Sequence, residues 1–266
     1  MDSTFIDETI FSCDNSLYQY WQSKCLAWTF TDVKQSGSLV RLLSVKNDRP
    51  RDIPEGLSTF ITKTYSPNEK TGDDFACYNK CGSVRDWIQT LPTQEESTVL
   101  LIDPDCVFLR PLRETTISGE IIAQDVSYMN PHEPKWKPVI DRHCKKNKDL
   151  LAAAGIPIVI KRSDLRRVSA RWLAKTEDIR NDALTKSLTG WLAEMWGWTI
   201  VCAEEGLRHK TKNLCQVPTE DRIDSPLIHY CYSSEDKMDL SLTKDIINLG
   251  INYQYTHLEY QKQQKL

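Results

Sequence analysis

Thr98-Val-Leu-Leu-Ile102 runs directly into Asp103-Pro104-Asp105, and this stretch decides how the rest of the sequence is interpreted. A short continuous apolar run is typical of a strand that is buried on both faces of a parallel sheet. Two carboxylates therefore follow the carboxyl end of a predicted central strand. Because open α/β sheets bind ligands outside the carboxyl ends of their strands, we expect Asp103 and Asp105 to lie in a binding site.

The segments on either side alternate between strand and helix patterns, which predicts an α/β fold. We predict strands at 4–12, 39–45, 57–63, 98–102, 199–203 and 227–230, and helices at 15–34, 78–90, 163–175 and 184–198. Ser163 is the expected amino-terminal cap of the third helix. The sequence contains no internal repeat and no Pro/Gly/Ser-rich linker. We therefore expect residues 1–266 to form a single domain.

Composition excludes several classes of protein. The chain has 34 Lys and Arg against 37 Asp and Glu, a net charge of -3, so no global charge favours nucleic acid. Its longest apolar run, 150–160, is shorter than the roughly 20 residues that span a bilayer, and we predict no membrane segment. Residues 1–8 carry acid where a signal peptide has a basic region, which predicts a cytoplasmic protein.

The nine cysteines are an odd number, and no Cys-x-x-Cys motif occurs. We predict that most of them are free, buried thiols. The sequence also lacks Gly-x-Gly-x-x-Gly, a Walker-type phosphate loop and a Gly-x-Ser-x-Gly elbow. These absences argue against the commonest dinucleotide, kinase-like and hydrolase sites.

Asp103 and Asp105 can direct two carboxylates at one divalent cation and at a diphosphate bound to it. His229, at the end of the last predicted strand, is a candidate third ligand because imidazole suits manganese. Lys237 lies in a polar segment and is a candidate to close over the diphosphate. The alternative is a solvated Asp-Pro-Asp turn, a structural histidine and a surface lysine.

Glu194 stands among tryptophans in Trp191-Leu-Ala-Glu-Met-Trp-Gly-Trp198. Such surroundings raise the pKa of a carboxyl group and suit a residue that faces a sugar. A helix that buries its tryptophans and leaves Glu194 outside explains the same residues equally well. Basic stretches at 142–148 and at Arg166, Arg167 and Arg171 either follow a phosphate backbone or are simply solvated.

Several stretches, taken in order, resemble the plant hydroxyproline O-arabinosyltransferase and peptidyl-serine α-galactosyltransferase family. They include Arg41-Leu-Leu-Ser44, Lys70-Thr-Gly-Asp73, Tyr78-Asn-Lys80, residues 99–111, Trp191 with Glu194, and Pro226-Leu-Ile-His-Tyr230. The resemblance implies a GT-A type nucleotide-sugar transferase fold, in which helices flank a mixed, mainly parallel central sheet.

The same resemblance implies roles for individual residues. Asp103, Asp105 and His229 would hold a divalent metal, manganese or magnesium, and a UDP-sugar would be the donor. Residues expected near that donor are Arg41, Ser44, Tyr65, Lys70, Asp73, Asn79 and Lys80, with Lys237 assisting the leaving group. Members retain the anomeric configuration, so Glu194 or Gln124 is expected to flank the reacting sugar.

We therefore expect a metal-dependent, retaining glycosyltransferase that moves arabinose or galactose from a UDP-sugar to an acceptor hydroxyl, a peptide hydroxyl being one candidate. Plant members carry a membrane anchor, and the expected cytoplasmic setting makes a second acceptor plausible, a hydroxymethylated DNA base, which would have to be flipped out of the duplex. Two further alternatives are a non-catalytic module that binds glycan or nucleic acid, and a hydrolase of nucleotide sugars.

Overall fold

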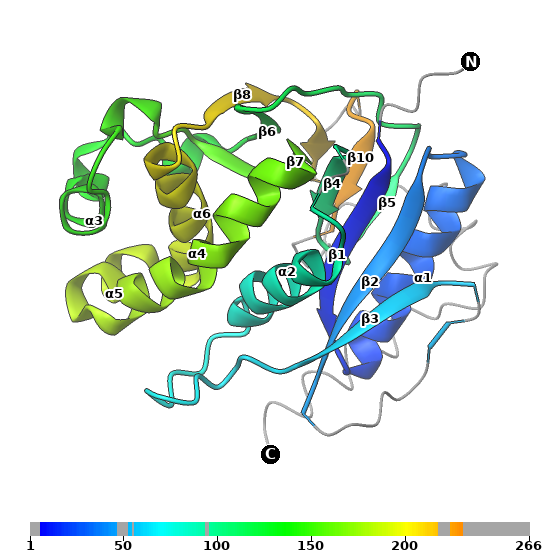
Figure 1. Ribbon diagram of the computed structural model, residues 1–266, viewed down its shortest axis with the longest axis horizontal. Helices are drawn as coiled ribbons and strands as arrows, with labels where there is room; N and C mark the ends of the chain where they lie inside the picture. Colours follow the sequence, from blue (N-terminus) through cyan, green and yellow to red (C-terminus); the bar gives the residue numbers. More distant parts are fainter. Residues whose placement is uncertain (1–5, 47–52, 55, 94–95, 218–223, 231–266) are drawn as a thin grey trace.

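The computed structural model describes residues 6–46, 53–54, 56–93, 96–217 and 224–230. Its centre is a seven-stranded sheet with the strand order β3-β2-β1-β4-β7-β6-β8 (Figure 1). These strands are β1 (Glu8–Asp14), β2 (Ser38–Val45), β3 (Ser58–Lys63), β4 (Thr98–Ile102), β6 (Glu120–Asp125), β7 (Ala154–Lys161) and β8 (Arg208–Lys212). Only β7 runs antiparallel to its neighbours, β4 and β6. The predicted mixed, mainly parallel sheet is confirmed.

A second, smaller sheet has the order β5-β10-β9. Its strands are β5 (Cys106–Phe108), β9 (Cys215–Gln216) and β10 (Leu227–His229). β10 pairs with β5 in antiparallel register, so that His229 lies opposite Cys106. This pairing brings His229 next to the Asp103-Pro104-Asp105 turn, which precedes β5 directly.

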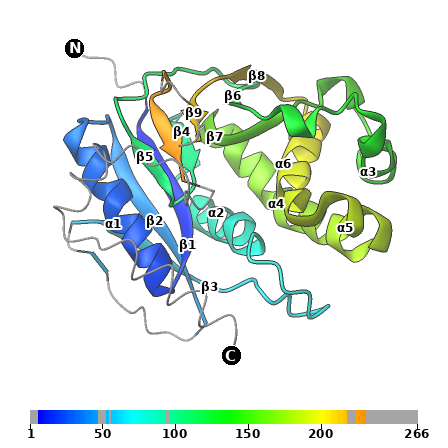
Figure 2. The same cartoon turned by 180° about the vertical axis from the view of Figure 1, so that it is seen from behind.

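Helices cover both faces of the large sheet (Figures 1 and 2). They are α1 (Leu17–Asp32), α2 (Tyr78–Thr90), α3 (Lys137–His143), α4 (Arg162–Asn181), α5 (Ala183–Thr189) and α6 (Ala193–Glu204), with short 3-10 turns η1 (Ser127–Met129), η2 (Pro134–Trp136), η3 (Lys148–Leu150) and η4 (Gly190–Leu192). The core on one face is formed with α2, α4 and α6, and the core on the other with α1 and the small sheet.

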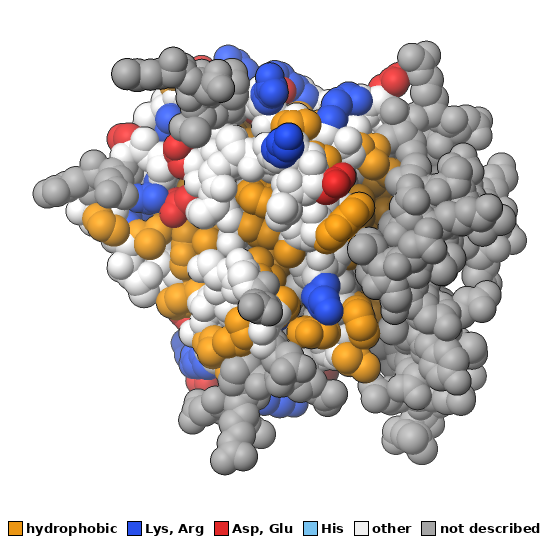
Figure 3. Space-filling model, turned by 90° about the vertical axis from the view of Figure 1, so that its right-hand side faces the viewer, with side chains coloured by type: hydrophobic (Ala, Val, Ile, Leu, Met, Phe, Trp, Pro, Cys, Tyr) orange, Lys and Arg blue, Asp and Glu red, His pale blue; other side chains and the backbone are white. Residues whose placement is uncertain are grey.

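Alternation along the central strands supplies both cores. In β4, Leu101 belongs to the core beside α2, whereas Leu100 and Ile102 belong to the core beside α1. All five residues of β4 are buried, as the continuous apolar run predicted. α1 exposes two large apolar side chains, Leu17 and Trp28. In the part of this side that the structure describes, hydrophobic side chains are more prominent than charged ones (Figure 3).

One predicted element is wrong, and two predicted helices begin or end at other residues than expected. Residues 199–203, predicted as a strand, form the second half of α6. A short β-branched run fits either a strand or a helix that is buried on all sides, and here it is helical and almost entirely buried. The predicted helix 184–198 is divided, because Gly190, the first residue of η4 directly after α5, has a φ of +52°.

The helix predicted at 163–175 is longer than expected. α4 begins at Arg162, with Lys161 at the cap position, so Ser163 is not the cap. The helix continues to Asn181 because its buried stripe continues through Thr176 and Ile179. The other predicted strands and helices are confirmed to within a few residues, apart from 4–5, which fall outside the described residues.

The eight described cysteines are free, and six of them are buried, which agrees with the prediction. Cys231 lies outside the described residues. None of the helices in the described part of the chain combines the length and apolar character that crossing a bilayer requires.

Candidate active site

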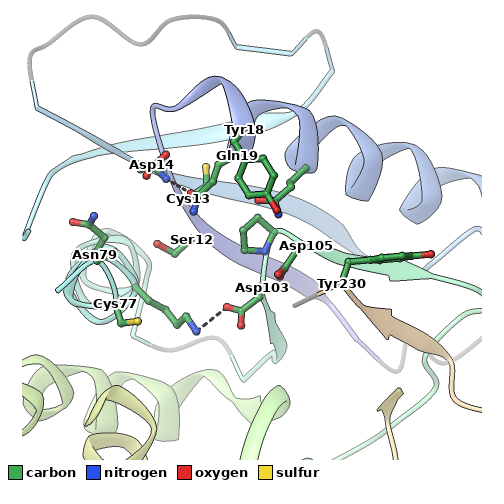
Figure 4. A pocket seen from close by; sticks show the side chains of 14 residues that line it. Ser12, Cys13, Asp14, Tyr18, Gln19, Cys77, Asn79, Asp103, Asp105 and Tyr230 are labelled. Atoms are coloured by element: carbon green, nitrogen blue, oxygen red, sulfur yellow. Dashed lines mark hydrogen bonds and ion pairs between the residues drawn. The ribbon is translucent and has the colours of Figure 1, made fainter. Parts of the chain in front are cut away.

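The carboxyl edge of the large sheet carries a pocket of about 290 Å³. β1 and β4 are parallel neighbours, with Phe11 opposite Ile102, so the polar residues that follow each strand meet at this edge. The pocket lies between the end of β1, the start of α1, the start of α2 and the turn after β4 (Figure 4). Its lining residues are Ser12, Cys13, Asp14, Tyr18, Gln19, Gln22, Ala76, Cys77, Asn79, Lys80, Asp103, Pro104, Asp105 and Tyr230.

Backbone hydrogen bonds hold the Asp-Pro-Asp turn in place. The N–H of Cys106 donates to the carbonyl of Asp103 at 3.1 Å, and the N–H of Tyr230 donates to the carbonyl of Asp105 at 3.0 Å. The imidazole Nε2 of His229 is 3.1 Å from Oδ1 of Asp105 and 3.8 Å from Oδ2 of Asp103. The turn therefore directs both carboxylates toward one histidine.

Lys80 enters the same site from the first turn of α2. Its Nζ is 2.7 Å from Oδ1 of Asp103 and 3.7 Å from Oε2 of Glu194, which comes from the first turn of α6. Exposed fractions of the three side chains are 15%, 19% and 5% in the order Lys80, Asp103, Glu194. One mostly buried cation thus lies between two mostly buried carboxylates.

Burial and charge act against each other on the pKa values of these groups. Burial lowers the pKa of Lys80, but the charges of Asp103 and Glu194 outweigh it and hold that pKa well above its usual value. Burial raises the pKa of Asp103, yet the charges of Lys80 and His229 bring it below the usual value. For Glu194 burial dominates and raises the pKa, although Lys80 opposes the shift.

The donor atoms at the turn suit a divalent cation. Burial lowers the pKa of His229, but the hydrogen bond to Asp105 and the surrounding negative charge raise it to about 10, so a bound cation would have to displace a proton from this imidazole. Asp105, Cys106 and His229 place one ligand atom each within 4.8 Å of one another. Carboxylate oxygen and imidazole nitrogen are ligands that manganese accepts. Asp105 and His229 fit the metal that the resemblance implies, but the third member of this cluster is Cys106, which the sequence analysis missed, and not Asp103.

Arg41 and Ser44 do not line the pocket. Both belong to β2, where Arg41 lies opposite Phe11 of β1 and Ser44 opposite Asp14. The Nε of Arg41 donates to Oγ1 of Thr59 at 3.2 Å, and burial lowers the pKa of this guanidinium. The hydroxyl of Ser44 is buried without a hydrogen-bond partner in the described structure. Both residues thus lie on the strand next to β1, whose end lines the pocket.

Asn79 connects the pocket to the predicted donor loop. Its Oδ1 accepts from the backbone N–H of Tyr65 at 2.6 Å and from the hydroxyl of Thr64 at 3.1 Å. The side chains of Tyr65, Lys70 and Asp73 are not among the lining residues. Lys70 is exposed, whereas Tyr65 and Asp73 are partly buried.

Asp73 and Tyr65 are held by internal partners. Arg180 donates to both carboxylate oxygens of Asp73, at 2.9 and 2.8 Å, and Lys186 lies 2.6 Å from Oδ1. Tyr65 donates its hydroxyl to Asp86 and packs its ring against Gly82. These contacts fasten the loop to α2, α4 and α5.

Gln124, predicted to flank the reacting sugar, has its amide engaged elsewhere. Its Oε1 accepts from the backbone N–H groups of Leu214 and Cys215 at 2.8 and 2.7 Å, and its Nε2 donates to the carbonyl of Asp125. Gln124 therefore connects β6 to the segment before β9 and does not line the pocket. Lys237 falls outside the described residues.

Ser12, Cys13, Asp14 and Tyr18 line the pocket, and the sequence analysis did not select them. The signal was present, because Asp14 ends a buried strand and Asn15 follows it, much as Asp103 follows β4. Tyr230 was not selected as a site residue either. It directly follows His229 and lies beside Asp105 (Figure 4).

The basic residues of α4 have internal acidic or carbonyl partners. Arg171 pairs with Glu204 and Glu205, and Arg167 pairs with Asp164. Arg166 donates to the carbonyls of Leu91 and Pro92, beyond the end of α2. The carboxylates offset the charges of Arg167 and Arg171, whereas Arg166 keeps its charge because its partners are neutral carbonyls.

Comparison with known proteins identifies relatives of this chain. A profile described as the hydroxyproline O-arabinosyltransferase family N-terminal domain matches residues 8–211. The peptidyl serine alpha-galactosyltransferase of Arabidopsis thaliana is 29% identical over 84% of this chain and 29% of that protein. Hydroxyproline O-arabinosyltransferase 3 of the same plant is 23% identical over 85% of this chain and 64% of that protein. The chain thus spans less than two thirds of the length of these curated relatives.

Solved structures share the fold. The galactosyltransferase LgtC, solved with donor and acceptor sugar analogues, superimposes with a TM-score of 0.50 at 12% identity, covering 85% of this chain and 87% of that chain. The bifunctional glycosyltransferase WbbM superimposes with a TM-score of 0.51 at 12% identity, covering 87% of this chain and 46% of that chain. The GT-A type fold expected from the resemblance is confirmed.

Proposed function

Because the chain belongs to the hydroxyproline O-arabinosyltransferase family, we propose that it is a metal-dependent glycosyltransferase that moves arabinose or galactose from a UDP-sugar to a peptide hydroxyl. One observation carries this proposal. Asp103, Asp105, His229 and Lys80 meet beside a pocket at the carboxyl edge of the sheet. Relatives named for transfer of galactose to peptidyl serine and of arabinose to hydroxyproline support the same reaction class.

Asp103, Asp105 and His229 are the residues that would hold a manganese or magnesium ion. When bound, such an ion neutralises the negative charge of a diphosphate leaving group. The two carboxylate oxygens of Asp103 have different neighbours, which suits this role. Oδ1 lies at Lys80 and Oδ2 lies on the side of His229, so one oxygen stays with the lysine while the other faces the histidine.

Lys80 contributes a fixed positive charge to the pocket wall. Its ion pair with Asp103 restricts the side chain, and restriction before the reaction is what makes a charge effective at a leaving group. The uridine and ribose would occupy the part of the pocket between Asp14, Tyr18 and Gln19. Lys237 is proposed to assist the same leaving group, as the sequence analysis expected.

The transfer step balances without any further reactant. The bond between the anomeric carbon and the diphosphate oxygen breaks, and the acceptor oxygen forms a new bond to that carbon. The proton of the acceptor hydroxyl passes to an oxygen of the departing diphosphate. Retention of configuration requires both events on one face of the sugar, the front-face route that the resemblance implies.

Glu194 is the better candidate to flank the reacting sugar. It lies within 3.7 Å of the Lys80 ammonium group, which lines the pocket. The amide of Gln124 is engaged with backbone groups, so Gln124 would first have to leave them. A carboxylate beside the anomeric carbon would stabilise the positive charge that develops as the bond between this carbon and the diphosphate oxygen breaks.

The test is a panel of UDP-arabinofuranose, UDP-galactose and UDP-glucose with manganese, scored for UDP release and for sugar attached to a peptide that contains serine and hydroxyproline. Asp105→Ala should lower transfer by about two orders of magnitude or more, since it removes a ligand of the metal. Asp32→Ala, an exposed change at the end of α1, is the matched control and should keep full activity.

Other outcomes reassign the function. UDP release that is independent of acceptor would identify a hydrolase of nucleotide sugars. Transfer to hydroxymethylated DNA and not to peptide would overturn the peptide acceptor. Absence of UDP binding with every sugar and metal would leave a non-catalytic binding module.

A further inference from the structure

The outward face of α1 carries large apolar side chains. The helix packs on β1, β2 and β5, and the residues that it buries are Ser23, Leu26, Thr29 and Phe30. Helical geometry places a second row of residues on the opposite side, at the three- and four-residue spacing of one helix face. This row, the outer stripe of α1, consists of Leu17, Trp21, Lys24 and Trp28. Leu17 is 47% exposed and Trp28 is 42% exposed.

The outer stripe contains one charged group. Lys24 is the only basic residue of α1, and its Nζ lies 5.7 Å from the centroid of the Tyr20 ring and 5.2 Å from that of Trp21. A helix at a protein surface usually has charged and polar residues opposite its buried face, and a helix that is apolar on all sides is normally covered. We therefore expect the outer stripe to be a contact surface.

The described part of the chain ends beside this stripe. Tyr230 is the last described residue, and it lines the pocket together with the first turns of α1. Burial raises the pKa of its phenol, and the thiol of Cys25 on α1 adds to the shift, so the ring lies close to that helix. Cys25 neighbours Trp21 and Trp28 on the helix surface. Residues 231–266 thus follow directly from a point next to the outer stripe.

Within residues 231–266, the range 238–251 carries most of the aliphatic side chains. They are Met238, Leu240, Leu242, Ile246, Ile247, Leu249 and Ile251. Leu242, Ile246 and Leu249 recur at the spacing that is typical of one apolar helix face. The same range contains Asp239 and Asp245, whose charge is complementary to that of Lys24.

We propose that the outer stripe of α1 is the docking surface for residues 238–251 of the same chain. The connection is long enough, because residues 231–237 can span about 23 Å when extended, whereas the helix rises only about 16 Å from Leu17 to Trp28. Because Tyr230 and the first turns of α1 both line the pocket, docking leads residues 231–237 along its rim. This inference goes beyond the proposed function and does not depend on it.

The charges favour this occupant over two others. A second copy that packed its own outer stripe on this one about a two-fold axis would bring two copies of Lys24 together, since Lys24 lies near the middle of the stripe. Helices that lie on membrane surfaces are rich in lysine and arginine, and α1 has Lys24 alone. The range 238–251 supplies both apolar side chains and the opposite charge.

The experiment follows trypsin cleavage after Lys244 in the full chain by mass spectrometry, with cleavage after Lys262, outside the docked range, as the reference. We expect Trp28→Ala and Ile246→Ala each to accelerate cleavage after Lys244 at least tenfold, because each removes an apolar contact that holds the segment. Trp28→Leu keeps an apolar side chain and should retain most of the protection. Trp191→Ala removes an exposed ring from η4 instead and should leave the rate unchanged.

The outcomes separate the three occupants. Cleavage after Lys244 at the same rate in Trp28→Ala, Ile246→Ala and the unchanged chain overturns the proposal. Protection that disappears on dilution, together with a light-scattering mass of two chains, assigns the stripe to a second copy and also overturns it. If Trp28→Ala lowers the urea midpoint, Ile246→Ala decides alone, because it changes no residue of the described fold. The assay contains neither UDP nor metal, so failure of the proposed function leaves its result unaffected.

Discussion

The Nζ of Lys80 lies 2.7 Å from Oδ1 of Asp103, so a lysine from α2 forms an ion pair with the first carboxylate after β4. The same Nζ is 3.7 Å from Glu194, at the start of α6. Three separate elements thus meet at one buried cation. This junction fixes the carboxylate that the proposed function uses, and it also contributes to the stability of the fold.

Replacing Lys80 tests that structural contribution. Lys80→Met leaves Asp103 and Glu194 buried without their common counter-charge, and breaking a buried pair in this way costs about 3–5 kcal/mol. Urea denaturation should show a corresponding decrease in the free energy of unfolding. Lys80→Met with Asp103→Asn should recover part of the loss, whereas equal stability of Lys80→Met and the unchanged chain would mean that the ion pair is dispensable.

Gly82 tests how the predicted donor loop is seated. A Cβ at this position would lie 2.1 Å from Cδ2 of the Tyr65 ring, so the ring must move. Overpacking of this kind costs about 1–3 kcal/mol, and we expect Gly82→Ala to lower the melting temperature. Because the clash is with Tyr65, the cost should be smaller in a Tyr65→Ala background. Strictly additive effects would show that the strain arises elsewhere.

Asp73 distinguishes a structural role from contact with the donor. Hydrogen bonds from Arg180 lower its pKa the most, burial opposes them, and Lys186 and Tyr78 add to the lowering. A depressed pKa contributes stability above the ordinary value of 3.8, and this contribution is lost as the pH falls below it.

Asp73→Asn should therefore reduce the free energy of unfolding at pH 7 by about 1.5–3 kcal/mol, the contribution of a hydrogen bond to a charged group. The same variant should flatten the decline of stability in acid. Calorimetry should give an unchanged UDP affinity, because Asp73 does not line the pocket. A tenfold loss of UDP affinity without loss of stability would place Asp73 at the donor instead.

His209 predicts a second dependence of stability on pH. Its Nε2 is 3.2 Å from the indole N–H of Trp198, and Nδ1 is buried without a partner in the described structure. Burial lowers the pKa of His209 to about 4, against an ordinary value of 6.5. The unfolded chain therefore takes up this proton first, and stability declines as the pH falls from about 6.5 toward 4.

His209→Gln keeps an oxygen that can accept from Trp198 but does not titrate. We expect this variant to show a shallower decline of unfolding free energy over the same interval. Denaturation series at pH 7, 6, 5 and 4 provide the measurement. Parallel curves for the two proteins would exclude His209 as the source.

The sequence predicted the carboxyl edge of the sheet well, because the burial of the strands and the direction of the chain determine which residues lie there. An apolar run that ends in Asp-Pro-Asp predicts a central strand buried on both faces, and β4 follows that run residue by residue, between a parallel neighbour, β1, and an antiparallel one, β7. The prediction for 199–203 failed because those residues are buried on every side. A pattern without a polar face does not distinguish a buried strand from a buried helix.

Only part of the site was predicted, because a local sequence pattern does not show which side chains meet in the folded chain. The pattern of adjacent residues in the sequence identified Asp103, Asp105 and Glu194. In the structure, Asp103 and Glu194 both lie next to Lys80. Gln124 and Asp73 have the right chemistry, but long-range partners engage both of them. Such partners depend on tertiary packing, which a local pattern does not reveal.

The most direct measurement is calorimetric titration of UDP into the full chain with and without manganese, repeated with Asp105→Ala. We predict that UDP binds with manganese, at least tenfold more weakly without it, and as weakly in Asp105→Ala whether or not the metal is present. UDP binding that is the same in all four titrations would contradict a metal–diphosphate site at Asp103 and Asp105.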